Sequence, residues 1–202
     1  MSDLYLWATR VDIVPEKEQA FNEWYTRVHM PQILACPGFV SARRYRAIEG
    51  IQRYFAMYEI REPSVLQGEK FQKVRGWYQF GPGVFSFARN VYERISPPED
   101  KPHMSDYLFT TRADIIPAKE QEWNEWDTQA RMEILACPGF ISARRYRAIE
   151  GIQRYFAAYE IREPSVLQGE KFQKVRGWYQ FGPGVFSFAR NVYERISPPV
   201  EK

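Results

Sequence analysis

Two histidines are the side chains of this 202-residue sequence best suited to moving a proton near neutral pH. His29 lies in the segment NEWYTRVHMPQIL, whereas His103 lies beside Pro102 in a proline-rich, charged stretch. A neutral imidazole accepts and returns a proton near pH 7, which suits isomerisation, cyclisation and elimination. We therefore expect His29 to act as a general acid or base. The alternative is a ring exposed at the end of a helix, where its charge only stabilises the helix dipole.

Arginine and tyrosine side chains around the segment ARRYR could bind an oxygen atom of a substrate. Strand alternation places Arg44 and Arg46 on the face opposite to Arg43 and Tyr45. An inward arginine could bind a carboxylate or an enolate, whereas an arginine on an edge strand limits aggregation. Tyr58, in the apolar segment that follows, could donate a hydrogen bond to a substrate oxygen. We expect a catalytic role for Tyr58 and a substrate-binding role for Arg44.

The sequence repeats itself, which is its strongest signal of organisation. Residues 41–98 and 142–199 differ only at Met57, which is Ala158 in the second copy. The preceding stretches also align, with scattered substitutions and a one-residue deletion near Pro31. A tandem duplication and a fusion of two homodimer subunits are both compatible with this pattern.

Each copy is long enough to be a complete small domain. We expect a first unit over 1–98, a linker over 99–106 and a second unit over 107–202. Apolar periodicity and turn residues in the first unit predict a β-α-β-β-α-β order, that of a ferredoxin-like unit. The predicted elements are strands at 4–13, 39–47, 52–60 and 84–95, a helix from Pro15, and a helix capped by Ser64 that runs to Val74.

The predicted strands have large apolar side chains on both faces. In the third strand, Tyr54, Ala56 and Tyr58 face one way, and Phe55 and Met57 face the other. A lone ferredoxin-like unit buries one face of its sheet under helices, so a second sheet must cover the other face. We therefore expect an α+β fold in which two ferredoxin-like βαββαβ repeats form a pseudo-dimeric α/β barrel. Such a chain should be monomeric in solution.

Aromatic residues make up 16% of the sequence, which is a high proportion. Such side chains are usually core residues but also line pockets for apolar or aromatic ligands. At several sites the two copies exchange large and small side chains, which would resize a shared cavity or repack a core. We expect Trp7 and Met57 to line one such cavity. The expected substrate-binding residues are Trp7, Phe21, Trp24, Tyr25, Arg44, Met57, Trp77 and Phe80.

Composition and motifs argue against several classes of protein. A net charge of +3 does not by itself indicate a nucleic-acid or anionic membrane partner, and no apolar run approaches the ~20 residues of a membrane span. Asp3 near the start and two lone cysteines, Cys36 and Cys137, favour a cytoplasmic protein with reduced thiols. Dinucleotide, P-loop, nucleophile-elbow and zinc-protease motifs are absent. We expect a small-molecule partner and neither metal nor cofactor, although haem held by His29 would leave no sequence signal.

The string NEWYTRVHMPQILACPGFVSARRYRA, followed by QRYFAMYEI, resembles the dimeric α/β-barrel superfamily. It is most similar to small bacterial proteins with a W-Y-x-x-x-H-x-P helix, a P-G-F turn and a strand that ends in R-R-Y. That superfamily includes cofactor-free monooxygenases, lactone isomerases, polyketide cyclases, aldol-type lyases and haem-binding members. The resemblance implies a ligand between the sheet and the helices of a unit, with the helix histidine as acid or base.

The second copy departs from this pattern, because it reads NEWDTQARMEILACPGF. Arg131 replaces His29, Asp127 replaces Tyr25, and Pro31 has no counterpart. An arginine stays protonated, so it cannot act as a base near neutral pH. The deletion would also rotate the end of the helix by about 100°. We therefore expect one productive site, in the first unit.

The expected function is that of a cofactor-independent lyase, isomerase or cyclase. Its substrate would be small and apolar, of an aromatic or polyketide-like kind, and bound between sheet and helices. The alternatives are a non-catalytic ligand-binding barrel, a cofactor-free monooxygenase and a haem-binding protein.

Overall fold

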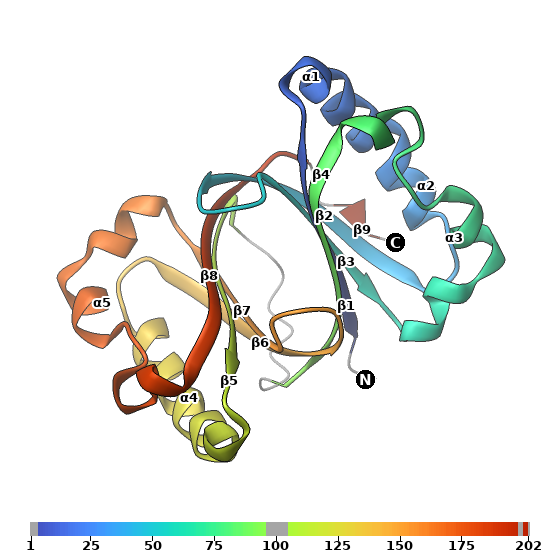
Figure 1. Ribbon diagram of the computed structural model, residues 1–202. Helices are drawn as coiled ribbons and strands as arrows, with labels where there is room; N and C mark the ends of the chain where they lie inside the picture. Colours follow the sequence, from blue (N-terminus) through green and yellow to red (C-terminus); the bar gives the residue numbers. More distant parts are fainter. Residues whose placement is uncertain (1–3, 96–104, 198–199, 202) are drawn as a thin grey trace.

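Each half of the chain folds into a four-stranded antiparallel sheet with helices on one face (Figure 1). The computed structural model describes residues 4–95, 105–197 and 200–201, so most of the predicted linker lies outside the described residues. The first unit contains β1 (Tyr5–Ile13), α1 (Pro15–Trp24), α2 (Met30–Leu34), β2 (Phe39–Glu49), β3 (Tyr54–Ile60), α3 (Glu69–Val74) and β4 (Val84–Arg94). The second contains β5 (Tyr107–Ile115), α4 (Glu120–Leu135), β6 (Phe140–Glu150), β7 (Tyr155–Ile161), α5 (Glu170–Val175) and β8 (Val185–Arg195).

The two sheets close into one eight-stranded antiparallel barrel. β4 pairs with β6 and β8 pairs with β2, so both seams that close the barrel join the two units. A further short strand, β9 (Val200–Glu201), pairs with β2 at Ser41 and Ala42. The predicted α+β fold, a pseudo-dimeric α/β barrel of two ferredoxin-like units, is confirmed.

Closure of the barrel changes the role of the arginines in the segment ARRYR. β2 lies between β3 and β8, so it is not an edge strand. Arg46 forms an ion pair with Glu194 of the second unit. The equivalent Arg147 pairs with Glu93 of the first unit, with 2.6 Å between Nε and Oε1. The edge-strand alternative is therefore wrong for Arg46, because this arginine joins the two units across a seam.

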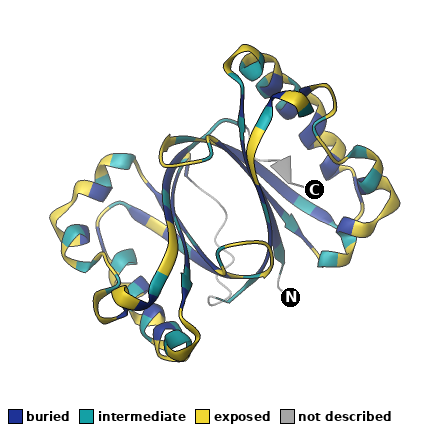
Figure 2. Cartoon of the chain, viewed as in Figure 1, coloured by how far each residue is buried: buried dark blue, intermediate teal, exposed yellow. Residues whose placement is uncertain are grey.

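The strands bury both faces, as their sequence pattern predicts (Figure 2). Tyr58 belongs to the helix-side core of the first unit, whereas Phe55 and Met57 belong to the core inside the barrel. Across the sheet, Tyr58 lies opposite Trp7, and Met57 lies opposite Ala8. The sheet therefore separates Met57 from Trp7, and the expectation that the two line one cavity is wrong.

The first long helix differs between the two units. In the first unit a π-helical turn, Tyr25–His29, joins α1 to α2, whereas α4 is a regular helix throughout. A π turn takes up one more residue than an α turn, which accounts for the residue that the second unit lacks. The ends of the two helices make equivalent contacts. Lys70 donates to the carbonyl of Ala35 over 2.8 Å, and Lys171 donates to the carbonyl of Ala136 over 2.7 Å. The expected rotation of the helix end does not occur.

The predicted helix from Ser64 to Val74 is divided in two. A 3-10 helix at Pro63–Gln67 is followed by Gly68, whose extended backbone interrupts the helix before α3 begins. Ser64 lies inside the 3-10 helix and does not cap it, so the predicted cap is wrong. Within the described ranges, no helix has both the length and the apolar composition that crossing a membrane requires.

The end of each unit's last long strand crosses over to the other unit. The backbone N–H of Ile95 donates to the carbonyl of Arg145, and that of Ile196 donates to the carbonyl of Arg44, over 2.9 Å in each case. Ile95 packs against the helix-side core that contains Trp123, and Ile196 packs against the helix-side core of the first unit. Each helix-side core is thus completed by a side chain from the opposite unit.

Candidate functional site

A cavity of about 260 Å³ lies between the sheet and the helices of the first unit. Four of the expected site residues line it together, namely Trp7, Tyr25, His29 and Trp77. The lining residues that sequence reasoning missed are Thr9, Phe71, Arg75, Gly76, Phe87 and Arg89.

Strand alternation could have identified three of the missed residues, of which Thr9 lies on the same side of β1 as Trp7. Phe87 and Arg89 lie on the same side of β4 as Val91, which belongs to the helix-side core. Arg75 and Gly76 lie in the loop after α3, where no periodic pattern indicates the direction of a side chain. The loop residues therefore had no signal in the sequence.

His29 is a buried imidazole that is neutral at pH 7. Only 3% of its surface is exposed, which excludes the surface alternative. Its ring stacks on Trp24 with 4.6 Å between the centroids, and Tyr25 meets it edge-on at 4.9 Å. Burial, and to a smaller extent the charge of Arg44, lowers the pKa of His29 to about 4. Its Nδ1 atom is buried and has no hydrogen-bond partner among the described residues.

The hydroxyls of Tyr25 and Tyr58 form a hydrogen bond of 3.0 Å. Burial raises the pKa of both phenols, so both are neutral. Tyr25 lines the cavity, whereas Tyr58 lies behind it with its ring against Trp7, 4.8 Å between centroids. Tyr58 therefore orients the hydroxyl of Tyr25 from behind the cavity wall.

Trp7 provides the second unpartnered polar atom among the residues that line this cavity. Its Nε1 is buried and forms no hydrogen bond with any described residue. An indole nitrogen can only donate, so Nε1 of Trp7 is a donor without an acceptor on a residue that lines the cavity.

Arg44 lies beneath Tyr25 and not in the wall of the cavity. Its Nη2 donates to the side-chain oxygen of Asn22 over 2.6 Å, and its guanidinium carbon lies 4.3 Å from the centroid of the Tyr25 ring. Burial lowers the pKa of Arg44 to about 10, which leaves it charged at neutral pH. Arg44 therefore acts on the cavity through its electric field.

Three of the remaining expected residues, Phe21, Trp24 and Phe80, support the site without lining it. Phe21 and Phe80 pack behind Trp24, and 5.0 Å separates the centroids of Trp24 and Phe80. Trp24 in turn holds the ring of His29. Met57 lies on the opposite face of the sheet.

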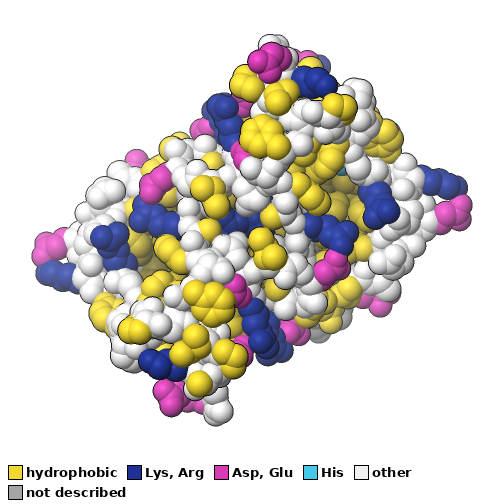
Figure 3. All heavy atoms as spheres, in the orientation of Figure 1, with side chains coloured by type: hydrophobic (Ala, Val, Ile, Leu, Met, Phe, Trp, Pro, Cys, Tyr) yellow, Lys and Arg dark blue, Asp and Glu magenta, His cyan; other side chains and the backbone are white. Residues whose placement is uncertain are grey.

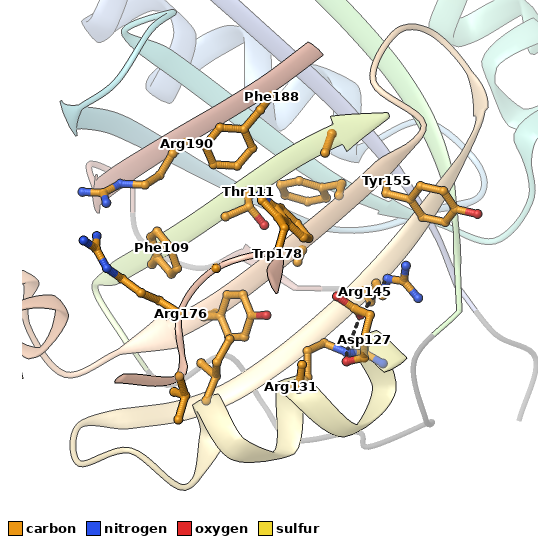
Figure 4. A pocket seen from close by; sticks show the side chains of 18 of the residues that line it. Phe109, Thr111, Asp127, Arg131, Arg145, Tyr155, Arg176, Trp178, Phe188 and Arg190 are labelled. Carbon is orange, nitrogen blue, oxygen red and sulfur yellow. Dashed lines mark hydrogen bonds and ion pairs between the residues drawn. The ribbon is translucent and has the colours of Figure 1, made fainter. Parts of the chain in front are cut away.

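The second unit has its own cavity, which is larger at about 450 Å³ (Figure 4). Asp127 replaces the ring of Tyr25, so this cavity extends as far as Arg145, the equivalent of Arg44. Its aromatic lining residues are Phe109, Trp123, Trp126, Tyr155, Phe156, Tyr159, Phe172, Trp178 and Phe188.

The polar groups of the second cavity are charged. Oδ2 of Asp127 lies 3.1 Å from Nε of Arg131 and 3.0 Å from Nε of Arg145. Burial raises the pKa of Asp127, and the two arginines oppose that rise. Arg176 and Arg190 lie together on the other side of the pocket (Figure 4). Arg176 and Arg190 correspond to Arg75 and Arg89 of the first cavity, so the cavities differ in Arg131, which replaces the neutral His29.

Neither a metal nor haem has a suitable site in the first cavity. The part of the chain that the structure describes contains no group of three or more His, Cys, Asp or Glu residues placed to hold a metal ion. The cavity of about 260 Å³ is smaller than the roughly 300–1,000 Å³ typical of pockets for drug-sized ligands, and Trp24 covers one face of the His29 ring. Haem exceeds such ligands in size, so it does not fit.

Comparison with known proteins identifies the fold. The sequence matches no protein-family profile and no curated protein. The structure is similar to that of an anthrone oxidase-like protein, with a TM-score of 0.74 over 100% of this chain and 94% of that chain, at 15% identity. It is also similar to a candidate monooxygenase from Lactobacillus acidophilus NCFM, with a TM-score of 0.63 over 98% and 96% of the two chains, at 6% identity. A variant of chlorite dismutase from Candidatus Nitrospira defluvii gives 0.60 over 96% and 92%, at 9% identity. These similarities place the chain among the ferredoxin-like α/β barrels, and at such identities they show the fold alone.

Proposed function

We propose that the protein is an enzyme that moves a proton on a small, mostly apolar ketone with an acidic C–H bond next to the carbonyl group. The reaction takes place in the first-unit cavity and needs no cofactor. The observation that carries this proposal is the pair of unpartnered polar atoms, Nδ1 of His29 and Nε1 of Trp7, on residues that line one aromatic cavity. The first can accept a proton and the second can only donate a hydrogen bond. A volume of about 260 Å³ suits a substrate of one or two rings.

His29 is the proposed general base. It takes a proton from a carbon next to the substrate carbonyl, and the electron pair of that C–H bond moves to the oxygen, which gives an enolate. The imidazolium is disfavoured in the free protein, since burial lowers the pKa of His29 to about 4. The negative charge of the enolate raises that pKa, so the two charges form together. Where a C=C bond of the substrate is conjugated with the enolate, return of the proton to the far carbon of that bond shifts the double bond and completes an isomerisation.

Three groups stabilise the oxygen on which charge develops. The indole N–H of Trp7 and the hydroxyl of Tyr25 are the donors, and the hydroxyl of Tyr58 orients that of Tyr25. The guanidinium of Arg44 beneath the ring of Tyr25 adds a positive charge. Donors and charges fixed in a site from which water is excluded favour the enolate over the neutral substrate.

Cofactor-free oxygenation is the second candidate function. The similarity to an anthrone oxidase-like protein over the full chain favours it. It begins with the same proton abstraction, and the resulting carbanion then reacts with dioxygen. Overall, one ring CH₂ group and one O₂ become one C=O group and one water, so dioxygen is the only co-substrate.

Solvent exchange under nitrogen tests proton abstraction apart from oxygenation. In D₂O the protein should exchange the acidic C–H hydrogen of phenolic ketones with one or two rings for deuterium, and proton NMR measures the rate of this exchange. Uptake of O₂ under air tests the second candidate function. His29→Gln should slow exchange about 100-fold or more, whereas His103→Gln should exchange like the wild type. Trp7→Phe introduces the residue that the second unit has at this position, so it should fold and exchange about tenfold more slowly. Binding of these ketones by the wild type without exchange would leave a non-catalytic barrel and overturn the proposal.

A further inference from the structure

The inside of the barrel contains a polar cluster that the proposed function does not use. Arg10 on β1 and Arg112 on β5 occupy equivalent positions in the two units, and each is only 1% exposed. Arg10 lies on the face of β1 that carries Leu6 and Ala8, both in the core inside the barrel. The cluster is therefore separated from both helix-side cavities by the sheet.

Neutral amides hold the two guanidinium groups. Nη2 of Arg10 donates to Oδ1 of Asn90 over 2.5 Å, and Nη2 of Arg112 donates to Oδ1 of Asn191 over 2.9 Å. Nη1 of Arg112 also donates to the side-chain oxygen of Gln52 over 3.3 Å. Among the described residues, neither arginine forms an ion pair with a carboxylate.

The carboxylates that follow two residues later on each strand have other roles. Oδ1 of Asp12 accepts from the backbone N–H of Arg53, and Oδ1 of Asp114 accepts from that of Arg154, over 2.7 Å in each case. A bulge in each strand separates these residues from the arginines. They anchor hairpins and do not bridge to Arg10 or Arg112.

Two hairpins fix the amides in place. Nδ2 of Asn90 donates to the carbonyl of Ile152, and Nδ2 of Asn191 donates to that of Ile51, over 2.7 Å in each case. The hairpins come from opposite units and lie at one end of the barrel (Figure 1), where apolar, cationic and acidic side chains all reach the surface (Figure 3). A Cβ at Gly151 would lie 2.4 Å from Nδ2 of Asn90, so this close approach requires glycine.

Several donors in the cluster have no acceptor. Nε and Nη1 of Arg10 and Nε of Arg112 are buried and without a hydrogen-bond partner in the described part of the chain. The hydroxyl of Tyr193, which lies close enough to feel the charges of both arginines, is buried and unpartnered as well. Buried polar groups in native proteins almost always have partners. The hydroxyls of Tyr92 and Tyr193 are neutral acceptors close to the arginines, so what the cluster lacks is an acceptor with a negative charge.

The cluster also brings two like charges together in the protein interior. Burial, together with the charge of Arg10, lowers the pKa of Arg112 to about 10, so Arg112 remains protonated at neutral pH. A buried charge needs a partner of opposite sign. An arginine does not become neutral instead, because its guanidinium group stays protonated in proteins. Donors without an acceptor and positive charges without an ion pair both indicate an anion.

We propose that Arg10 and Arg112 bind one small monoanion, of the size of chloride or formate, inside the barrel. The site takes one arginine from each unit, so the anion links the two halves of the chain. The enclosure of both side chains excludes larger anions. Gln52 contacts Arg112 and also lines an open depression at this end of the barrel, together with Asp12, Asp114 and Glu150. The proposed route of entry passes Gln52.

The test measures the melting temperature of the full chain while chloride or formate replaces gluconate at constant ionic strength. The melting temperature should rise and saturate, because an ion that binds only the folded state stabilises it by mass action. Sulfate, which is larger and divalent, should give no saturable rise. Equal melting temperatures in gluconate and chloride, or an equal response to sulfate, would overturn the proposal.

Two variants and a direct readout complete the test. Arg112→Gln should abolish the saturable rise, whereas Arg162→Gln, which removes an exposed arginine of the same unit, should retain it. Tyr193→Phe keeps the ring and removes only the hydroxyl, so it should fold and raise the apparent dissociation constant for chloride about tenfold. Chlorine-35 NMR should show broadening by the wild type and less by Tyr193→Phe, even if Arg112→Gln does not fold. A saturable rise retained by Arg112→Gln, or no broadening by the wild type, contradicts the assignment.

Discussion

The depressed pKa of His29 gives the folded protein a specific sensitivity to acid. Burial lowers this pKa from 6.5 to about 4. Between these two pH values the unfolded chain binds a proton that the folded protein does not, so stability declines as the pH falls from about 6.5 to about 4. The decline due to His29 is on the order of 3 kcal/mol and is absent above pH 6.5.

Urea unfolding at pH 7.5 and pH 4.5 measures this contribution. The wild type should lose about 2–3 kcal/mol more than His29→Gln between the two pH values. Both proteins contain the same other titrating groups, so the difference isolates His29. Equal losses would show that this histidine titrates normally in the folded state.

Met57 provides a second prediction for a single residue. It lies inside the barrel, so Met57→Ala should cost about 2–5 kcal/mol in the free energy of unfolding without changing the preferred ligand size. Chemical unfolding and binding of ligands of graded size measure the two effects separately. A change of ligand preference with unchanged stability would show that Met57 reaches the helix-side cavity.

At the scale of elements, the π-helical turn makes the first unit's helix tolerant of a deletion. Removing Pro31 gives this segment the same length as the equivalent segment of the second unit. There a regular helix, α4, ends in the same contacts. We therefore expect the deletion variant to fold, with a melting temperature close to that of the wild type. Exchange of substrate protons should fall about tenfold or more, because the turn holds Tyr25 and His29 at the cavity.

Circular dichroism, thermal melting and solvent exchange test this variant together. Deletion of Gln173, inside the short regular helix α5, is a control that has no π turn to absorb the change and should unfold. An unfolded Pro31 deletion variant would mean that the turn does not compensate for the extra residue.

Local sequence patterns predicted the helices and strands well, but they did not predict which site residues lie in the cavity wall and which lie behind it. Alternation along the strands correctly placed Arg44 on the face opposite to Tyr45 and Tyr58 on the face opposite to Met57, and the apolar residues on both faces predicted the barrel. The same patterns do not show that Tyr25 covers Arg44, because that depends on how far the helix lies from the sheet. The π turn was also missed, since its extra residue leaves the apolar positions at either end of the helix unchanged.

At the scale of the whole molecule, the units depend on each other. Each seam pairs strands of different units, and the core inside the barrel combines Tyr45 and Phe55 of one with Tyr146 and Phe156 of the other. The full chain should therefore be a monomer of 24.0 kDa that unfolds cooperatively. An isolated second unit would expose a large apolar face and should self-associate or aggregate. Light scattering after size-exclusion chromatography distinguishes these outcomes, and a well-folded monomeric single unit would contradict the interdependence.

The two units also give one barrel two cavities of different chemistry. They share almost all their sheet residues, yet one cavity contains a neutral histidine and the other contains Asp127 between two arginines. The charged and ionisable groups differ because the first long helix carries Tyr25 and His29 in one unit and Asp127 and Arg131 in the other, and Trp7 on β1 is replaced by Phe109 on β5. Substitutions on one helix can thus change the chemistry of one cavity while the barrel stays the same.

Imidazole NMR of His29 tests the central claim, that a buried neutral base faces a ligand cavity in the first unit. The chain has two histidines, so His103→Gln leaves a single imidazole to observe. The account predicts a signal that titrates near pH 4 and shifts when a phenolic ketone of one or two rings is added. A signal that titrates near pH 6.5 and does not respond to the ketone would contradict it.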